Sequence, residues 1–208
     1  MDGISFLNEW TWASQLGHFL IAVALGSGLV ATLGYGLSVG RGSSDELSEN
    51  QLELKRLGRW GFRVHSWAIG LAFFLLYFLI FSHRYEFSYI WKHLNDVMPT
   101  SFVFSSFWGG QEGGFFLWMG FMLILAAVFL RRKPGRWESP VIAVVAGITT
   151  LLTTMLLGLY FGEYQFGIDP FLLLRQSPEN LGLPWTWNPD YLVLIPQFAD
   201  GQGLNPLL

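Results

Sequence analysis

The chain has 208 residues, of which 52% are hydrophobic and 13% are charged, and its formal net charge is −3. A soluble domain carries about 25% charged residues, so this composition and a mean hydropathy of +0.40 indicate an integral membrane protein. The composition gives no support to nucleic-acid binding, and the lack of cysteine excludes a disulfide framework and a thiol nucleophile within the chain.

The first ten residues carry Asp2 and Glu9 but no Lys or Arg, so we do not expect a cleavable secretory signal there. Four apolar segments then approach or exceed the roughly 17–25 residues that a membrane-spanning helix needs. The first segment has small residues four apart, Ala22 with Gly26 and Ala24 with Gly28, which favours close packing against a neighbouring helix. We expect an all-α integral membrane fold with transmembrane helices at 17–39, 60–81, 113–130 and 140–161.

Basic residues are unevenly distributed between the connections of these four segments. Most of them lie between or beside the first two segments, or between the third and the fourth: Arg41, Lys55, Arg56, Arg59, Arg63, Arg131, Arg132, Lys133 and Arg136. Because Lys and Arg mark the cytoplasmic side, both termini are expected on the outer, periplasmic side. On the inner side, residues 45–57 are acidic at the start and basic at the end, which predicts a short amphipathic surface helix.

Two long segments are left for the outer side, the loop 82–112 and the tail 162–208. In the loop, residues 84–99 mix aromatic and charged side chains, which predicts a short interfacial helix that ends before Pro99. The tail has turn-forming residues and no span. We therefore divide the chain into a four-helix transmembrane region, 1–161, and an outer-face tail, 162–208, which we expect to lead into a missing downstream region of a longer membrane protein.

The third span begins with the sequence W-G-G-Q-E-G-G-F-F-L-W, residues 108–118. Its four glycines remove side chains, so that the backbone and a flat partner can come close: Gly109, Gly110, Gly113 and Gly114. Glu112 is expected at the start of the following helix, where the helix dipole stabilises a carboxylate. It is either a functional group at the membrane surface or a carboxylate that satisfies free helix N–H groups. A phosphate loop is excluded because no Lys-Ser/Thr pair follows, and a dinucleotide site because no βαβ unit is present.

Three of the four histidines are expected on the outer side, His18 and His83 at span ends and His93 in the loop. Two of them are able to face one another and ligate a haem iron, but imidazoles at span ends also commonly lie in the polar boundary. His65 is predicted to be an interfacial residue near the inner end of its span. We expect no metal site, since no His-x-x-x-His pair or cysteine is present.

Two further patterns bear on function. Trp185 and Trp187 are either belt anchors or an aromatic shelf for a flat ligand. The middles of the four expected spans lack Asp, Glu, Lys, Arg and His, which argues against an ion or proton pathway.

The motif at 108–118 resembles the W-G-x-x-E-G-S-L-L-L-W signature of the CcmF branch of the cytochrome c-type biogenesis membrane proteins, a haem-handling family that also includes CcsA. The sequence D-G-Q-G-L-N-P-L-L, residues 200–208, is similar to that family's G-R-D-L-N-P-L-L stretch. The chain departs from the family pattern in Gly114, where serine is usual, and in a longer segment at 168–198. The positions that carry the resemblance are Trp108, Gly109, Glu112, Gly113, Trp118, Gly201, Leu204, Asn205, Pro206, Leu207 and Leu208.

The resemblance implies a multi-pass protein of the bacterial inner membrane, corresponding to the N-terminal part of a haem lyase subunit. Such a subunit helps present haem for covalent attachment to apocytochrome c on the outer face, with a haem chaperone and other maturation membrane proteins as partners beside membrane lipid. In the family the H-P-P motif and the tryptophan-rich WWD domain follow the second motif. We therefore expect the haem ligands downstream, and the 208 residues alone to be inactive as a lyase, with catalytic residues unassigned.

Two other functions stay open from the sequence. One is a transporter or channel subunit in which the glycine-rich segment lines a substrate path. The other is a membrane scaffold that only docks partners.

Overall fold

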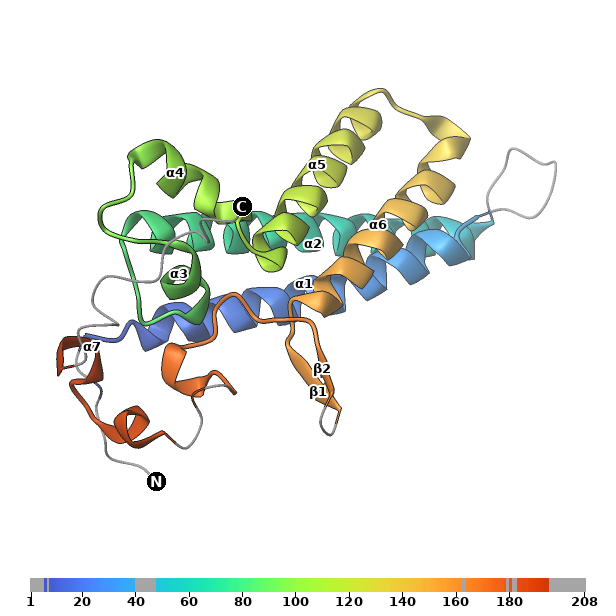
Figure 1. The fold of residues 1–208 in the computed structure, drawn as a ribbon. Coiled ribbons are helices and arrows are strands. Elements are labelled where there is room, and N and C mark those ends of the chain that lie inside the picture. Colours follow the sequence, from blue (N-terminus) through green and yellow to red (C-terminus); the bar gives the residue numbers. More distant parts are fainter. Residues whose placement is uncertain are drawn as a thin grey trace. The chain divides into compact units, whose positions relative to one another are not determined.

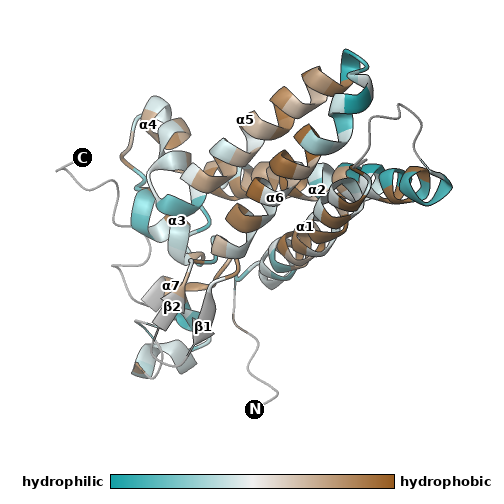
Figure 2. Cartoon of the chain, turned by 90° about the vertical axis from the view of Figure 1, so that its right-hand side faces the viewer, coloured by the Kyte–Doolittle hydropathy of each residue, from teal (hydrophilic) through white to brown (hydrophobic). Residues whose placement is uncertain are grey.

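The computed structural model describes residues 6, 8–39, 48–161, 164–178, 180 and 183–194 (Figure 1). This part of the chain contains four helices that are long and apolar enough to cross a membrane, as the sequence predicts. Figure 2 shows that hydrophobic residues dominate their middles, whereas hydrophilic residues gather at the start of α2 and between α5 and α6. The four helices are α1 (Thr11–Leu37), α2 (Glu49–Phe81), α5 (Gln111–Arg131) and α6 (Glu138–Met155), the last preceded by a 3-10 turn, η2 (Gly135–Trp137).

Shorter elements connect and follow these helices. The expectation of an all-helical fold is met except for a small antiparallel hairpin, in which Leu159 lies opposite Phe166. The hairpin starts earlier than the expected end of the fourth span, because Gly158 has a φ of 57° and turns the chain out of the helix. The shorter elements are α3 (Ser88–His93), α4 (Thr100–Ser105), η1 (Ser106–Trp108), β1 (Leu159–Phe161), β2 (Tyr164–Phe166), η3 (Leu174–Gln176), η4 (Pro184–Trp187) and α7 (Tyr191–Leu194).

Helix α2 is longer than its apolar part. The predicted surface helix at 45–57 is not a separate element, because its described residues from Glu49 onward continue without a break into the span. Gly58, which lies at the join, packs against α1: a Cβ atom on Gly58 would lie 2.8 Å from the Tyr35 nitrogen, and one on Gly34 would lie 2.7 Å from the Gly58 nitrogen. The glycine therefore permits close helix packing and does not end the helix.

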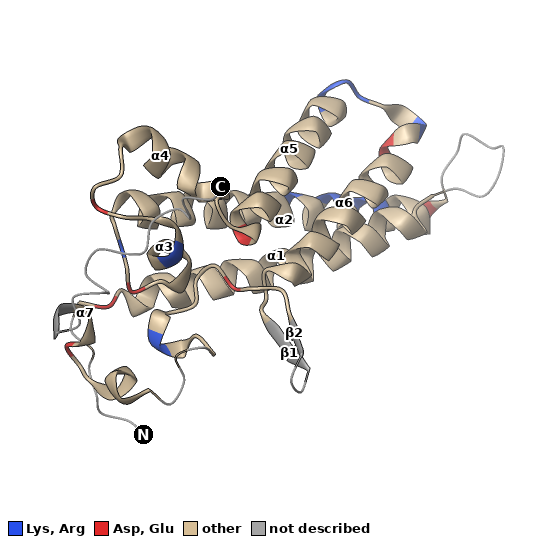
Figure 3. Cartoon of the chain, viewed as in Figure 1, with Lys and Arg blue, Asp and Glu red and all other residues tan. Residues whose placement is uncertain are grey.

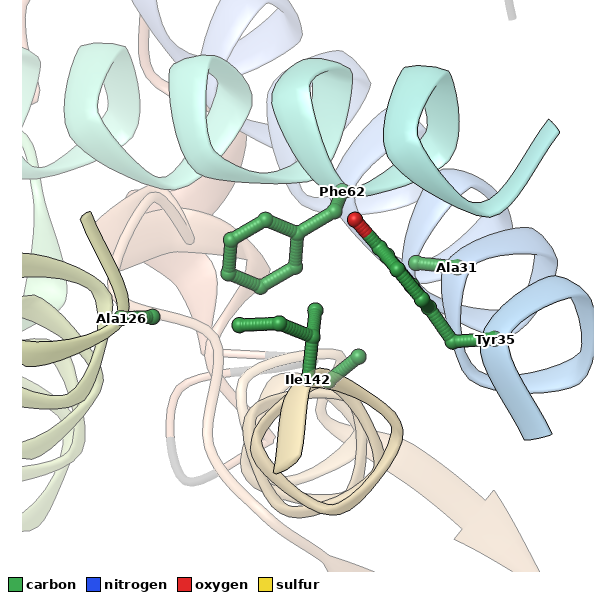
Figure 4. Close-up of a cluster of buried hydrophobic side chains, with 6 residues drawn as sticks. Ala31, Tyr35, Phe62, Ala126 and Ile142 are labelled. Atoms are coloured by element: carbon green, nitrogen blue, oxygen red, sulfur yellow. The ribbon is translucent and has the colours of Figure 1, made fainter. Parts of the chain in front are cut away.

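The chain forms two compact units. One unit comprises Phe19–Ala72 and Phe115–Ile168, and its core joins α1, α2, α5 and α6. Figure 4 shows Tyr35, Phe62 and Ile142 pointing toward one another from three of these helices. The buried residues of this core are Ala31, Tyr35, Phe62, Ala126, Ile142 and Ala146.

A buried carboxylate also holds this unit together. Glu138, at the start of α6, accepts two hydrogen bonds of 2.6 Å from the Arg59 guanidinium and lies 3.1 Å from the Lys55 Nζ atom. The Tyr35 hydroxyl donates a further bond of 3.2 Å. The carboxylate thus ties α6 to α1 and α2, and two basic residues that the sequence marks only as topology signals have a structural role as well. Figure 3 shows basic residues along α2 and between α5 and α6.

The other unit comprises Met1–His18, Phe73–Gly114 and Asp169–Leu208. Its described tail is anchored to the loop that follows α2, through a β-bridge between Phe87 and Leu173 and a bond of 2.9 Å from the Ser88 nitrogen to the Leu172 carbonyl. Glu9, before α1, pairs with Arg175 at 3.0 Å and accepts a hydrogen bond of 2.8 Å from the Tyr191 hydroxyl. The described tail is therefore packed onto the start of the chain.

Candidate functional site

The glycine–glutamate motif lies at the start of α5. Glu112 is in the first turn of this helix, as the sequence predicts, and it is only 6% exposed. The Glu112 side chain is thus packed inside the protein and is not a surface side chain.

The glycines of the motif make room for Tyr89 of α3. The Tyr89 hydroxyl donates a hydrogen bond of 2.5 Å to the Phe107 carbonyl, and the Gly110 N–H donates one of 3.4 Å to the same hydroxyl. A Cβ atom on Gly113 would overlap the Phe107 carbonyl oxygen, and one on Gly110 would lie 2.7 Å from the Tyr89 ring. Burial raises the pKa of the Tyr89 hydroxyl, which keeps it a neutral donor. The flat partner of these glycines is therefore a side chain of the same protein.

Gly114 behaves differently from Gly113. A Cβ atom at this position would meet nothing within 4 Å. The serine that is usual here in the family motif would consequently fit without rearrangement, so this departure leaves the local structure intact.

His93 packs on the same tyrosine. Its ring lies 4.6 Å from the Tyr89 ring, and its Nδ1 atom lies 2.7 Å from the Tyr89 carbonyl oxygen. A carbonyl only accepts hydrogen bonds, so Nδ1 carries the proton and the neutral ring has an unprotonated Nε2. Burial lowers the pKa of His93, which favours this neutral form.

Two charged groups from other segments act on the Glu112 carboxylate, and one of them is paired with a histidine. It interacts electrostatically with the Lys92 ammonium group of α3 and with the Asp169 carboxylate of the tail. Asp169 in turn pairs with His18 of α1, with 2.5 Å between Oδ2 and Nε2. We name these four residues, Glu112, Lys92, Asp169 and His18, the glutamate cluster. Figure 3 shows acidic residues at the start of α5 and after the hairpin, and a basic residue on α3.

The contacts of His83 are with residues outside the glutamate cluster. Its Nδ1 atom lies 2.9 Å from Asp96 Oδ1 and 3.1 Å from the Tyr85 hydroxyl. His83 also has a φ of 50°, at the point where the chain leaves α2. His18 and His83 thus have different carboxylate partners, and haem ligation by His18, His83 or His93 stays a prediction.

His65, predicted to be an interfacial residue near the inner end of its span, does not face the surroundings of the protein. Its side chain is completely buried, with Nδ1 2.7 Å from the Ala24 carbonyl and Nε2 2.9 Å from Thr149 Oγ1. The burial results from tertiary packing, because His65 lies between α1 and α6 and both of its ring nitrogens contact these helices. Gly28 packs beside this imidazole, as expected for the small residues of α1, whereas a Cβ atom on Gly26 would meet nothing within 4 Å.

The other predicted site residues are placed as follows. Trp108 ends η1, Gly109 follows it, and both Trp108 and Trp118 are exposed. Within the described residues, no group of three or more His, Asp or Glu side chains is arranged to hold a metal ion. Gly201, Leu204, Asn205, Pro206, Leu207 and Leu208 lie outside the described residues.

Sequence reasoning missed Tyr89, Lys92 and Asp169. The first two share a turn of α3 with His93, so their three- and four-residue spacing on a helix was a usable signal. Asp169 gave no such signal, because its place depends on the tail folding back onto α1 and α3.

No family model and no solved structure matches the chain. Curated relatives do match. The cytochrome c-type biogenesis protein CcmF of Pseudomonas fluorescens is 28% identical over 161 residues, which are 76% of this chain and 20% of that protein. CcmF of Pseudomonas aeruginosa is 26% identical over 197 residues, or 93% of this chain and 25% of the relative.

The cytochrome c-type biogenesis protein NrfE of Haemophilus influenzae is 29% identical over 143 residues, which are 68% of this chain and 18% of NrfE. The chain therefore spans a quarter or less of the length of these relatives. The matches confirm the resemblance: the chain is similar to the CcmF and NrfE cytochrome c-type biogenesis proteins over 68–93% of its length.

Proposed function

We propose that this chain acts in cytochrome c maturation at a bacterial inner membrane and helps present haem for covalent attachment to apocytochrome c on the outer face. The observation that carries the proposal is the similarity to CcmF proteins, which extends over 76% and 93% of the chain in the two Pseudomonas relatives. Four helices long and apolar enough to cross a membrane support a multi-pass location.

The glutamate cluster is the part of the chain that we assign to this role. Four separate segments supply its residues, and the Tyr89 hydroxyl and the glycines fix the turn that carries Glu112. The Glu112 carboxylate is buried and interacts electrostatically with Lys92 and Asp169, and we assign it a structural or docking role rather than proton transfer. In this proposal Glu112 maintains the local geometry, or binds a cation of a partner such as a haem chaperone.

In this proposal haem is the substrate that the protein helps to deliver, and not a resident cofactor. The described histidines fit a haem site only in part: His83 and His93 are bonded through Nδ1, which leaves Nε2 for a ligand, whereas the Nε2 atom of His18 is bonded to Asp169. Because the family motifs that carry haem ligands follow the segment matched here, we assign the haem ligands to the downstream part of the relatives.

The distribution of basic residues supports an orientation with both chain ends on the periplasmic side, which would place the glutamate cluster there as well. The chain has no cysteine, so single cysteines at Gln111 and at Glu53, both exposed, provide a direct test. In intact spheroplasts, a membrane-impermeant maleimide is expected to label Gln111→Cys and to leave Glu53→Cys unlabelled. The reverse pattern would overturn the orientation.

The function is tested by restoring c-type cytochrome maturation in a strain that lacks the gene. At equal protein level, Glu112→Ala is expected to lower covalent haem in the cytochromes by at least about tenfold, since losing a buried charge interaction costs about 2–5 kcal/mol. Gln111→Ala, at the exposed neighbouring position, is the matched control and is expected to leave maturation unchanged. Equal maturation by both variants would refute the role of the cluster.

The transporter alternative is not favoured. The reported relatives are biogenesis proteins, and the buried ionisable groups Glu138 and His65 are bonded to other protein groups. Normal maturation together with lost solute uptake in Glu112→Ala would reverse this preference. Normal haem loading with lost co-purification of a partner would instead indicate a scaffold.

A further inference from the structure

The segment just before the glycine–glutamate motif has an apolar surface. No charged residue occurs between Asp96 and Glu112. In α4 and η1, Phe102, Phe104 and Trp108 are 54%, 51% and 43% exposed. Three large aromatic side chains thus project from one short segment, beside the hydroxyl groups of Thr100, Ser101 and Ser105.

The same segment is fixed against a span. The Phe107 ring stacks on Tyr77 of α2 with 4.1 Å between the centroids and 2° between the planes. Phe104 lies 5.6 Å from Tyr77, and Tyr77 lies 6.1 Å from Phe81, the last residue of α2. Trp108 meets Phe104 edge-on at 5.5 Å. The aromatic rings therefore form a continuous row from the end of α2 through α4 to the end of η1.

This row continues the outward surface of α2. Phe74, Phe78 and Phe81 are exposed on the last two turns of this helix, which is long and apolar enough to cross a membrane. Side chains that project from a spanning helix face lipid, so the exposed rings of α4 and η1 adjoin a lipid-facing surface. Phenyl and indole rings beside hydroxyl groups, without charges, suit the boundary between lipid headgroups and acyl chains.

We infer that α4 and η1 form a membrane anchor, with Phe102, Phe104 and Trp108 inserted into the phospholipid leaflet at this end of α2. The short helix predicted at 84–99 is present as α3, and the inference places the lipid contact in the next helix instead. The helix found there, α3, has Ser88, Tyr89 and Ile90 buried inside its unit, and the exposed aromatic residues lie after Pro99.

The anchor has a consequence for the glycine–glutamate motif. Gly109 and Gly110 directly follow η1, and Glu112 begins the next span. With aromatic side chains in lipid on one side and a span on the other, the turn that carries Glu112 is held at a fixed depth at the membrane surface. The inference concerns lipid contact alone and does not depend on a role in cytochrome maturation.

The test uses the natural lack of cysteine. Single variants Phe102→Cys and Phe104→Cys receive a nitroxide label, and the 208-residue protein is reconstituted into nanodiscs of phosphatidylethanolamine and phosphatidylglycerol. Collisions with oxygen, which partitions into lipid, are compared with collisions with a water-soluble nickel chelate. Glu53→Cys, exposed on the charged start of α2, is the water control, and Leu125→Cys, exposed on α5, is the lipid control.

For both anchor positions we expect an oxygen-to-nickel collision ratio about fivefold above that of Glu53→Cys and approaching that of Leu125→Cys. A ratio equal to that of Glu53→Cys would show contact with water and overturn the inference. Low collision rates with both reagents would also overturn it, because they would show that protein, from another segment or a second copy, covers the rings.

A second measurement avoids labelling altogether. Phospholipids brominated near the headgroup quench tryptophan fluorescence on contact. The wild-type protein is expected to show more quenching than Trp108→Phe, a conservative variant. Equal quenchable fluorescence in the two proteins would show that Trp108 is not in lipid.

Discussion

Adding one methyl group at Gly113 or at Gly114 is predicted to have opposite effects on stability. In Gly113→Ala the new Cβ atom overlaps the Phe107 carbonyl oxygen and lies 2.5 Å from the Tyr89 hydroxyl. The carbonyl belongs to the backbone and is unable to rotate away. In Gly114→Ala the new atom meets nothing within 4 Å.

The size of each effect follows from these contacts. Overpacking in a well-packed site costs about 1–3 kcal/mol, and weakening the bond between Tyr89 and Phe107 adds about 1 kcal/mol. Replacing glycine by alanine in a helix raises the free energy of unfolding by at most about 1 kcal/mol. We therefore expect Gly113→Ala to lower the free energy of unfolding by about 2–3 kcal/mol, and Gly114→Ala to raise it by about 0.5–1 kcal/mol.

Thermal unfolding in mild detergent measures the difference. At about 2–4 °C per kcal/mol for a chain of this size, Gly113→Ala is expected to melt about 4–12 °C below the wild type and Gly114→Ala slightly above it. The packing argument fails if Gly113→Ala is as stable as the wild type, or if both alanines shift the melting temperature in the same direction.

Three further predictions concern buried polar groups. Glu138→Ala leaves the Arg59 and Lys55 cations without their carboxylate and is expected to cost about 3 kcal/mol in thermal unfolding, and an unchanged melting temperature would contradict the structural role of the ion pair. His65→Ala removes bonds to α1 and α6 and is expected to cost about 2–3 kcal/mol, whereas a smaller loss than in the exposed control Glu53→Ala would contradict its burial. The lowered pKa of His93 predicts that its contribution to stability is full above about pH 6.5 and is lost as the pH falls through the lowered value, so the stability difference between wild type and His93→Gln should shrink from pH 7.5 to pH 5. Parallel pH profiles of the two proteins would refute this prediction.

Local sequence signals predict the four spans and the place of Glu112 because these features depend on short windows. An apolar run of sufficient length specifies a spanning helix, and a carboxylate after glycines specifies a helix start. Short sequence windows do not predict helix boundaries correctly where a charged stretch is followed directly by an apolar one. The charged residues from Glu49 to Arg59 belong to α2, so the expected surface helix and the second span are one continuous helix.

The composition of the glutamate cluster depends on tertiary structure. Asp169 comes from a segment more than 50 residues after Glu112, and only the folded tail brings it near His18. The environments of the aromatic residues in the tail also depend on tertiary structure. Trp185 packs on Tyr191 with 5.3 Å between the rings, whereas Trp187 is exposed, although the two share one motif.

The most direct test of the proposed function is the amount of covalently bound haem in the c-type cytochromes of the host. It is measured in cells with the gene, without it, and with it restored on a plasmid. Loss of covalent haem on deletion and its recovery on restoration is the result that the account predicts. Unchanged covalent haem in the deletion strain, with normal apocytochrome synthesis, would contradict a role in cytochrome c maturation.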